Sequence, residues 1–464
     1  MRRKIHFVSL GCPKNRVDSE VMVGVAADAG YGLATEAEDA DVIVVNTCGF
    51  IGEAKKESID TIFEMAELRK AGSCSKLVVT GCLSQRYPTE LSEQMPEVDH
   101  FLGSSDMLKL KQVLGGKAKR MLVGNPADWI VRAKDPRILT GPSASAYVKI
   151  AEGCNRTCAF CTIPEFRGKQ RSRPLADVVR EVKELVAQGV LELNLISQDT
   201  VAYGRDLEGR PSLAELVRAV ADVPGVRWVR VFYLYPETLT EELTDVLANH
   251  PKVVKYVDMP LQHAADAMLK RMRRGHGKDR QKRVVERLRN AIPGLTFRTA
   301  FIVGHPGETD AEFQELVDFV NWAKFERVGV FRYSDEESAK SFALEGKVTP
   351  LQAGKRYRAL MSAARKIARA HQKSLIGKEL DVLVEGVSEE HEFVMQGRHA
   401  GQAPEIDGHV FLSGDECHPG QLRRVRVEQA SDYDLVGTLI DVGERPKKRS
   451  APVRLKVLAS REAG

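Results

Sequence analysis

Three cysteines in the middle of the chain stand at a spacing that suits iron-sulfur chemistry. Cys154, Cys158 and Cys161 form the pattern C-x3-C-x2-C. Thiolates at this spacing can bind three irons of a 4Fe-4S cubane and leave the fourth iron open. A structural zinc ion would take a fourth Cys or His ligand, which neither flank offers, and an odd set of cysteines does not make a disulfide framework. The segment therefore predicts a cluster with one iron open to a ligand.

This spacing, together with Phe160 directly before the last cysteine, resembles the radical S-adenosylmethionine superfamily. In that superfamily the amino and carboxylate groups of S-adenosylmethionine chelate the open iron. An electron from the cluster then cleaves the sulfonium and releases a deoxyadenosyl radical. The resemblance implies hydrogen abstraction from a carbon that no side-chain base could deprotonate, while the protein orients the reactants and excludes water.

Three further cysteines each follow a short apolar run in the first hundred residues. In the first unit, the apolar run 5–10 precedes Cys12 and a helical pattern over 16–29. In the second, the run 42–45 precedes Cys48 and a helical pattern over 53–70, and in the third, the run 77–80 precedes Cys82 and a helical pattern over 84–95. Such a β/α alternation predicts a parallel sheet, and the carboxyl ends of parallel strands meet at one edge. We therefore expect the three cysteines to converge and to hold a second 4Fe-4S cluster, again with one iron lacking a protein ligand. The alternative is that each is an ordinary buried cysteine.

A cysteine-triad domain placed before a radical S-adenosylmethionine core is the pattern of the methylthiotransferases, and the resemblance covers nearly the whole chain. In that family the N-terminal, auxiliary cluster delivers sulfur. One S-adenosylmethionine methylates sulfur bound there, and a second is cleaved at the other cluster to make the substrate radical. The resemblance implies conversion of a C–H bond to C–SCH3. Cys74 and Cys417 have no partners at a useful spacing and are interpreted as plain thiols.

Length and composition fit three folded domains. About 150 residues per domain gives three domains for 464 residues, and a hydrophobic content of 43% suffices for sizeable cores. No stretch approaches the roughly 18–20 apolar residues of a membrane span. Thiolates on iron need a reducing compartment, so we expect a cytoplasmic protein without membrane contact. The predicted boundaries are 1–136 for the N-terminal cluster domain, 140–374 for the radical core, 375–441 for a β-barrel and 442–464 for a basic tail.

The pattern of the central domain predicts an α/β fold, a partial (β/α)6 barrel. The predicted strands are 146–151, 192–196, 228–234, 253–258, 296–303 and 327–333. In such barrels the active site lies at the carboxyl ends of the strands, where Gln198 and the turn at Gly304 fall. Backbone N–H groups of that turn could meet a polar ligand, or the turn could be a simple strand-to-helix connection.

By resemblance, several of these positions match contacts of the superfamily. Phe160 and Gln198 stand where the family contacts S-adenosylmethionine, and Gly304 to Glu308 match its adenine-contacting region. Asp199 falls among the family's cofactor and substrate contacts. His263 is left open between a substrate contact and a structural histidine.

From Ile376 to Asp441, short alternating runs predict a small antiparallel β-barrel. Its length, position and closing segment 433–437 resemble the TRAM module that ends methylthiotransferases and usually binds RNA. The segment carries five bases against fourteen acids, whereas the whole chain has a net charge of +5. Because acids repel a phosphate backbone, we expect this barrel to attract a basic protein. The alternative is that these acids are ordinary solvated surface.

Three basic segments remain. The run 270–283 could contact RNA or form a solvated helix face. The basic helix 355–373 is expected to close the core and to lead to the barrel. The tail after the barrel is interpreted as disordered or as a contact for ribosomal RNA.

A short motif separates two types of methylthiotransferase. This chain reads Cys12-Pro13-Lys14-Asn15, the pattern of enzymes that modify a ribosomal protein, whereas enzymes that modify adenosine in transfer RNA typically read Cys-Gln-Met-Asn. The stretch 258–263 also resembles the ribosomal-protein type. The resemblance implies methylthiolation of the β-carbon of an aspartate in small-subunit ribosomal protein S twelve, a basic protein. It further implies a monomer that draws on a separate electron donor and sulfur source.

Two alternatives remain open. One is a transfer-RNA adenosine methylthiotransferase, which the acidic barrel and the Pro13-Lys14 motif disfavour. The other is a non-catalytic iron-sulfur protein of ribosome assembly or redox sensing, which would bind clusters without cleaving S-adenosylmethionine.

Overall fold

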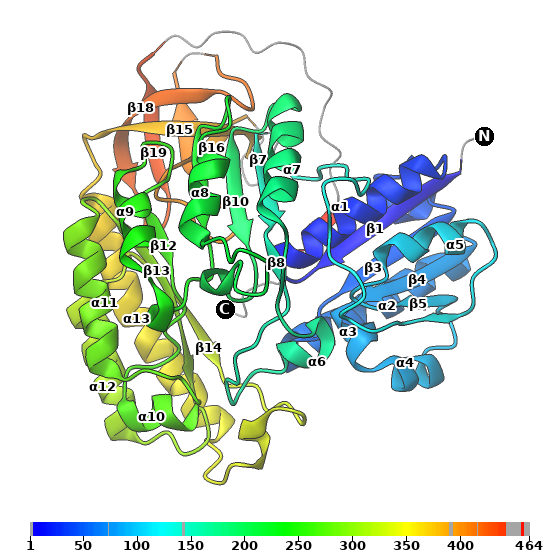
Figure 1. Cartoon of the computed structure of the whole chain (residues 1–464), viewed down its shortest axis with the longest axis horizontal. Helices are drawn as coiled ribbons and strands as arrows, with labels where there is room; N and C mark the ends of the chain where they lie inside the picture. The colour runs from blue at the N-terminus through cyan, green and yellow to red at the C-terminus, as the bar shows by residue number, and fades with distance from the viewer. Residues whose placement is uncertain are drawn as a thin grey trace.

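The computed structural model describes residues 3–72, 74–141, 144–388, 393–414, 416–441 and 456–458. Figure 1 shows three parts: an N-terminal α/β part in blue, a larger central part in green and yellow, and a C-terminal barrel in orange at the top. The predicted α/β architecture with a C-terminal β-barrel is confirmed, but the barrel is not antiparallel throughout, because the strands Val410–Ser413 and Leu435–Leu439 pair in parallel. None of the helices in the described ranges is long and apolar enough to cross a membrane.

The N-terminal part is a parallel sheet with the strand order β2-β1-β3-β4-β5-β6. Its strands are β1 (Lys4–Leu10), β2 (Gly32–Leu33), β3 (Val42–Thr47), β4 (Lys76–Gly81), β5 (His100–Leu102) and β6 (Met121–Leu122). Its helices are α1 (Pro13–Asp28), α2 (Gly52–Ala71), α3 (Cys82–Arg86), α4 (Pro88–Gln94) and α5 (Leu110–Leu114), with 3-10 turns η1 (Ala37–Asp39) and η2 (Met107–Lys109). The central strands β1, β3 and β4 are almost wholly buried, as expected for a sheet covered on both faces.

One prediction about this part is wrong in detail. The helix expected over 84–95 is two helices, because Pro88 lacks the N–H of a helix interior and begins a new helix instead. In the predicted tail, β20 (Lys456–Leu458) pairs in parallel with β1. The rest of the predicted basic tail lies outside the described residues.

The central part is a partial β/α barrel of six parallel strands. The strands are β7 (Ser145–Lys149), β10 (Glu192–Ile196), β11 (Trp228–Val231), β12 (Tyr256–Asp258), β13 (Thr296–Val303) and β14 (Arg327–Arg332). Hydrogen bonds join β7, β10 and β11 in one sheet and β12, β13 and β14 in another, and a bridge between Val229 and Val253 links the two. The strand predicted over 228–234 ends at Val231, because Tyr233 adopts a φ of 58° that an extended strand excludes.

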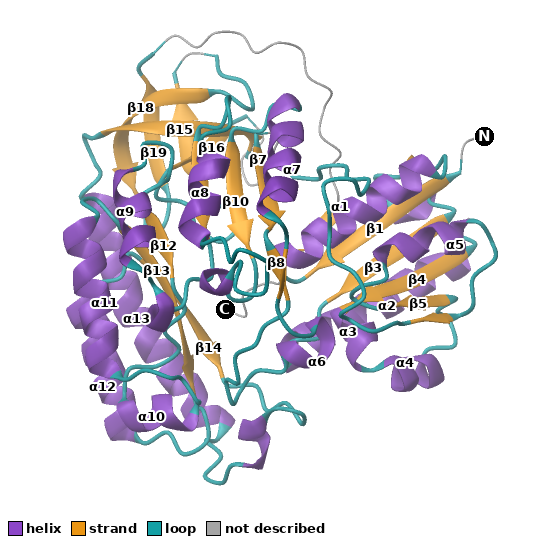
Figure 2. Ribbon diagram, in the orientation of Figure 1, coloured by secondary structure: helices purple, strands orange, loops and turns teal. Residues whose placement is uncertain are grey.

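Helices lie on the outside of these strands (Figure 2). They are α7 (Leu175–Ala187), α8 (Leu213–Ala221), α9 (Glu241–Asn249), α11 (Lys278–Ala291), α12 (Asp310–Ala323) and α13 (Pro350–Lys373). The connections hold β8 (Ala151–Glu152), β9 (Arg171–Ser172), α6 (Ile163–Arg167), α10 (Asp266–Arg271), η3 (Thr200–Ala202), η4 (Pro236–Thr238) and η5 (Lys340–Ala343). Val178, Val182 and Leu185 of α7 recur at helical spacing and pack into the core of this part, which explains why this amphipathic stretch is helical.

The C-terminal part is a closed barrel with the order β15-β16-β17-β19-β18. Its strands are β15 (Glu379–Val387), β16 (Met395–His399), β17 (Val410–Ser413), β18 (Leu422–Ala430) and β19 (Leu435–Leu439). β16 gives no strand signal in the sequence, because its buried residues Gly397, Arg398 and His399 lack an alternating apolar pattern. One hydrophobic cluster contains Phe7 of β1, Phe232 after β11 and Leu383 of β15, so the three parts pack against one another.

A fully buried ion-pair group joins the barrel to the central part. Arg398 of β16 pairs with Glu192 of β10 at 2.6 Å, and Arg230 of β11 pairs with the same carboxylate at 3.0 Å. Burial alone would raise the pKa of Glu192, but the two guanidinium groups lower it to about 2. The barrel is therefore held on the core by a charge that stays ionised at neutral pH.

Glu192→Gln should lower the free energy of unfolding by about 2 kcal/mol at neutral pH, because hydrogen bonds to charged groups are lost. The folded-state pKa lies below the ordinary value of 4.5, so this stabilisation is present above that value and is lost as the pH falls toward 2. Urea unfolding of both proteins should show their difference narrowing over that range. Glu379→Gln, at a half-exposed pair with Arg426 on the same barrel, is the control and should change stability little. A difference that stays constant with pH would contradict the assignment.

Several described acids of the barrel pair with cations from other parts of the molecule. Asp432 pairs with Arg369 of α13, Glu405 with Arg16 of α1, and Asp407 with Arg327 of β14. These cations lie outside the barrel, so they neutralise part of its acid excess. The prediction that the barrel attracts a basic protein stays a prediction.

Candidate functional site

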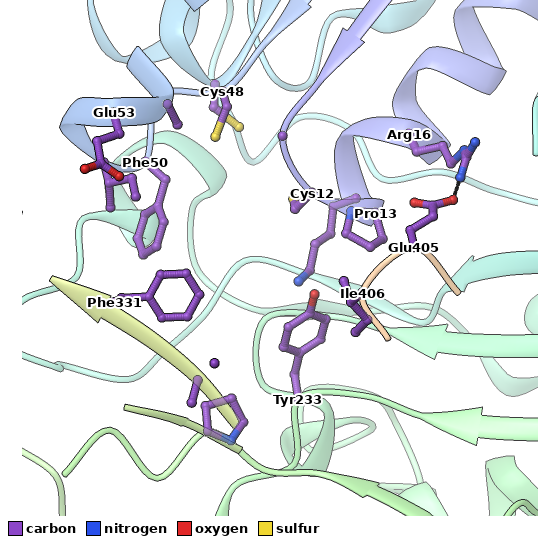
Figure 3. A pocket seen from close by; sticks show the side chains of 18 of the residues that line it. Cys12, Pro13, Arg16, Cys48, Phe50, Glu53, Tyr233, Phe331, Glu405 and Ile406 are labelled. Atoms are coloured by element: carbon purple, nitrogen blue, oxygen red, sulfur yellow. Dashed lines mark ion pairs between the residues drawn. The ribbon is translucent and has the colours of Figure 1, made fainter. Parts of the chain in front are cut away.

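A cavity of about 1950 Å³ lies where the three parts of the molecule meet, and both predicted cysteine triads line it. Cys12, Cys48 and Cys82 reach it from the N-terminal sheet, and Cys154, Cys158 and Cys161 reach it from the central barrel. Figure 3 shows Cys12 and Cys48 on the N-terminal side, with Tyr233 of the central part directed toward Cys12 and Pro13. The structure thus brings together six cysteines that the sequence separates by up to 149 positions.

The N-terminal triad converges because β1, β3 and β4 are neighbours in the sheet. Cys12 caps the start of α1, Cys48 follows β3, and Cys82 begins α3. The amide of Asn15 donates hydrogen bonds to the carbonyls of Leu10 at 3.0 Å and Thr47 at 2.9 Å, which ties the ends of β1 and β3 together. The Cys-Pro-Lys-Asn motif therefore sets the geometry of this edge.

Gly11 makes room for the triad. Its φ is +85°, and an added Cβ would lie 2.8 Å from the Cβ of Cys48 and 3.1 Å from its sulfur. Gly11→Ala should therefore destabilise the fold by about 1–3 kcal/mol and displace Cys48. Gly30→Ala is a matched control, because Gly30 has a φ of +86° but no atom within 4 Å of the added Cβ. Thermal unfolding and iron bound after reconstitution would measure both effects, and equal iron content in the two variants would contradict the role given to Gly11.

The central triad lies in the loop between β8 and α6. Cys154, Cys158 and Cys161 are all half-buried. Burial raises the pKa of Cys154 to about 11 and that of Cys161 to about 12, with further increases from neighbouring thiols. Burial likewise raises the pKa of Cys82 in the N-terminal triad to about 11. Thiolates in either triad therefore need positive charge among them, which bound metal supplies.

Across the residues that the structure describes, no three His, Cys, Asp or Glu side chains stand close enough to hold a single metal ion.

A buried charge network beside Cys82 connects the N-terminal and central parts. Arg167 of α6 contacts the Cys82 sulfur through Nη2 at 3.1 Å and pairs with Asp18 of α1 at 2.9 Å. It also pairs with Glu152 of β8 at 3.3 Å, and Lys149 of β7 pairs with both Asp18 and Glu152 at 2.6 Å. Burial alone would raise the pKa of Glu152, but Lys149 and Arg167 lower it to about 2. The N-terminal and central parts therefore meet through ionised side chains, one of which, Arg167, contacts the predicted cluster ligand Cys82.

Two cationic residues of the cavity, Arg156 and Arg274, were not predicted from the sequence as site residues. Arg274, in the basic run that was left open between RNA contact and solvated helix, is buried and contacts the Cys158 sulfur at 3.4 Å. The guanidinium groups of Arg274 and Arg156 lie 4.2 and 3.8 Å from the ring centre of Tyr235. The only sequence signal for Arg156 is its place inside the cysteine loop, and no local signal marks Arg274.

The predicted cofactor contacts fall into two groups. Phe160 and Gln198 line the cavity, and Gln198 donates a hydrogen bond to Glu152. Gly304 and Glu308 are not among the lining residues. The buried Glu308 accepts hydrogen bonds from the Gly304 backbone at 2.6 Å and from Arg356 at 2.8 Å, and it contacts His263 at 3.1 Å. Glu308 and His263 therefore belong to an internal hydrogen-bond network. Of the two interpretations of His263, this favours the structural histidine over the substrate contact.

Comparison with known proteins agrees with this geometry. The family model for the Radical SAM superfamily matches residues 148–320, the TRAM domain model matches 376–440, and the model described as uncharacterized protein family UPF0004 matches 4–103. The TsrM radical S-adenosylmethionine methyltransferase of Kitasatospora setae has the same fold, with a TM-score of 0.52, 16% identity and coverage of 71% of this chain and 73% of that one. Fold and site together define a radical S-adenosylmethionine enzyme.

Curated relatives give the particular family. "Ribosomal protein uS12 methylthiotransferase RimO" of Sorangium cellulosum is 68% identical over 456 residues, which covers 97% of this chain and 93% of that protein. The protein of the same name from Myxococcus xanthus is 49% identical over 97% of this chain and 94% of its own length. The chain therefore belongs to the RimO family of radical S-adenosylmethionine methylthiotransferases. The transfer-RNA alternative is not favoured.

Proposed function

We propose that this enzyme replaces a hydrogen on the β-carbon of an aspartate in ribosomal protein uS12 with a methylthio group. The observation that carries the proposal is the opening of two cysteine triads into one cavity. One triad suits the cleavage of S-adenosylmethionine and the other suits the delivery of sulfur. The names of relatives that share almost the whole chain support uS12 as the substrate.

Each triad would hold a 4Fe-4S cluster. Cys154, Cys158 and Cys161 would leave one iron for S-adenosylmethionine, and Cys12, Cys48 and Cys82 would leave one iron for sulfur. When bound, these groups supply the radical that takes the hydrogen atom and the methylated sulfur that replaces it. The second cluster is part of the proposal, and the donor chemistry and spacing of the N-terminal thiols support it.

The surrounding side chains orient the reactants. Phe160 and Gln198 line the cavity beside the central triad and would contact S-adenosylmethionine. Gly304 and Glu308 would act from behind, because the Glu308 carboxylate fixes the Gly304 turn.

The proposal also includes the cellular compartment, the domain limits and the external sources of electrons and sulfur. We place the protein in the cytoplasm, since a ribosomal substrate and iron-bound thiolates both suit a reducing compartment. The domain limits 1–136, 140–374 and 375–441 contain the three matched ranges. An electron donor and a sulfur source act from outside the chain.

Deuterium at the reacting carbon provides the test. Reconstituted full-length enzyme would receive S-adenosylmethionine, sulfide, a reductant and a uS12 peptide deuterated at the aspartate β-carbon. We expect deuterium in the released deoxyadenosine together with a methylthiolated peptide. Deoxyadenosine free of deuterium and an unmodified peptide would contradict the proposal, and the same assay with transfer RNA would then test the alternative.

A further inference from the structure

Lys14 is a buried cation that no carboxylate neutralises among the ion pairs of the described residues. Eight Lys and Arg residues line the cavity. Six of them pair with acids: Arg16, Lys56, Arg156, Arg167, Arg298 and Arg332. Arg274 donates to the Pro260 carbonyl at 3.0 Å. Lys14 is only 8% exposed, and its described contact is the ring of Tyr233, 3.2 Å from its nitrogen.

A buried ammonium group without a directly paired anion is costly unless a ligand completes it. Glu152 and Asp258 act on Lys14 electrostatically, but neither forms an ion pair with it among the described residues. The face of Tyr233 compensates for part of the lost hydration through its negative quadrupole. That contact leaves the ammonium N–H groups free to donate to something else. A carboxylate is the chemical group that suits them best, because charge-assisted hydrogen bonds are the strong ones.

The backbone around Tyr233 is held in an unusual conformation to make this contact. Tyr233 has a φ of 58°, and its N–H donates to the Asp258 carboxylate at 3.0 Å. Arg298 fixes the other oxygen of Asp258 at 2.8 Å. Gln262, which also lines the cavity, has a φ of 73°. Strained residues that the surroundings hold firmly are typical of ligand sites.

A chain of contacts links Lys14 to both triads. Lys14 stands two residues after Cys12, and its ammonium group contacts the ring of Tyr233. Two residues after Tyr233, the ring of Tyr235 packs against Arg274, which contacts the Cys158 sulfur. Lys14 and both triads line the same cavity, so a group anchored at Lys14 would share that space with both.

We propose that Lys14, supported by Tyr233, binds the side-chain carboxylate of the substrate aspartate. This inference rests on the proposed function and adds the residue that selects the substrate group. The β-carbon is bonded directly to that carboxylate carbon, so an anchored carboxylate fixes the reacting C–H between the triads. An uncharged adenine ring would offer the ammonium group only neutral acceptors, which make weaker hydrogen bonds than an ionised carboxylate.

The role of Lys14 in binding the carboxylate can be tested by comparing the affinities of the wild-type enzyme and a Lys14 variant for peptides with and without the target aspartate. Reconstituted full-length enzyme and its Lys14→Met variant would each be titrated with the uS12 peptide and with the same peptide carrying asparagine in place of the target aspartate. The wild-type enzyme should prefer the aspartate peptide by about 10-fold or more. Lys14→Met should lose the preference, Lys14→Arg should keep it, and Lys111→Met, at an exposed lysine of α5, should not change it.

Iron content and cluster spectra distinguish carboxylate binding by Lys14 from a second possible role, which is to balance the charge of a nearby cluster. If Lys14 only balanced the charge of a nearby cluster, Lys14→Met would change the iron content or the spectrum and keep the aspartate preference, which would overturn the inference. Equal affinity of the wild-type enzyme for the two peptides would overturn it without any variant. Failure of the proposed function would give a different result from failure of the Lys14 inference. In that case the wild-type enzyme would form no methylthiolated product from the aspartate peptide.

Discussion

Alanine in place of Cys12, Cys48 or Cys82 should abolish methylthio transfer while leaving reductive cleavage of S-adenosylmethionine in place. The central triad, which the proposed function assigns to cleavage, remains complete in these variants. The N-terminal triad alone is assigned to sulfur, so its loss removes only the second step. Chromatography of deoxyadenosine and mass spectrometry of the peptide would measure the two steps separately.

Variants of the central triad should give a different result from variants of the N-terminal triad. Alanine at Cys154, Cys158 or Cys161 should abolish both deoxyadenosine and product, because the open iron is lost. Cys417→Ala is the control, since Cys417 is a buried thiol of the barrel outside the cavity. Persistent methylthiolation by a triple alanine variant of the N-terminal triad would refute the assignment of two clusters.

Arg167→Met should lower the free energy of unfolding by about 3–5 kcal/mol, the cost of removing one partner from a buried ion-pair group. Asp18 and Glu152 would then share only Lys149, and the Cys82 sulfur would lose its guanidinium contact. We also expect less iron in the N-terminal triad, because its wall against the central part is disturbed. Urea unfolding and iron analysis of the reconstituted protein would measure both.

An exposed arginine gives the matched control for this variant. Arg218 pairs with Glu242 at the surface, where both side chains are at least 40% exposed. Arg218→Met should therefore change stability by less than about 1 kcal/mol. Equal losses in the two variants would show that Arg167 has no special role in joining the N-terminal and central parts.

Local patterns in the sequence predicted the scaffold of the site. The strands 192–196 and 296–303 agree with the structure residue for residue, because buried apolar runs bounded by turns have few other solutions. The convergence of Cys12, Cys48 and Cys82 followed from strand order in parallel sheets. The cysteine spacing and Phe160 predicted the second triad but not its place relative to the first, and only the structure shows both triads lining one cavity.

Long-range contacts could not be predicted in this way. The link from Arg167 to Cys82 joins residues 85 positions apart, and the link from Lys14 to Tyr233 joins different parts of the molecule. Charged side chains follow no periodic pattern, so their burial becomes visible only when the surfaces meet. The end of β11 at Val231 was missed for a related reason, because Asp258 imposes the conformation of Tyr233 from another strand.

A peptide mass spectrum of uS12 from cells with and without this gene tests the central claim most directly. We expect the aspartate-containing peptide from cells with the gene to carry one methylthio group in place of one hydrogen. The peptide from the deletion strain should lack it, and a plasmid copy of the gene should restore it. Identical peptide masses in the two strains would contradict the proposed substrate.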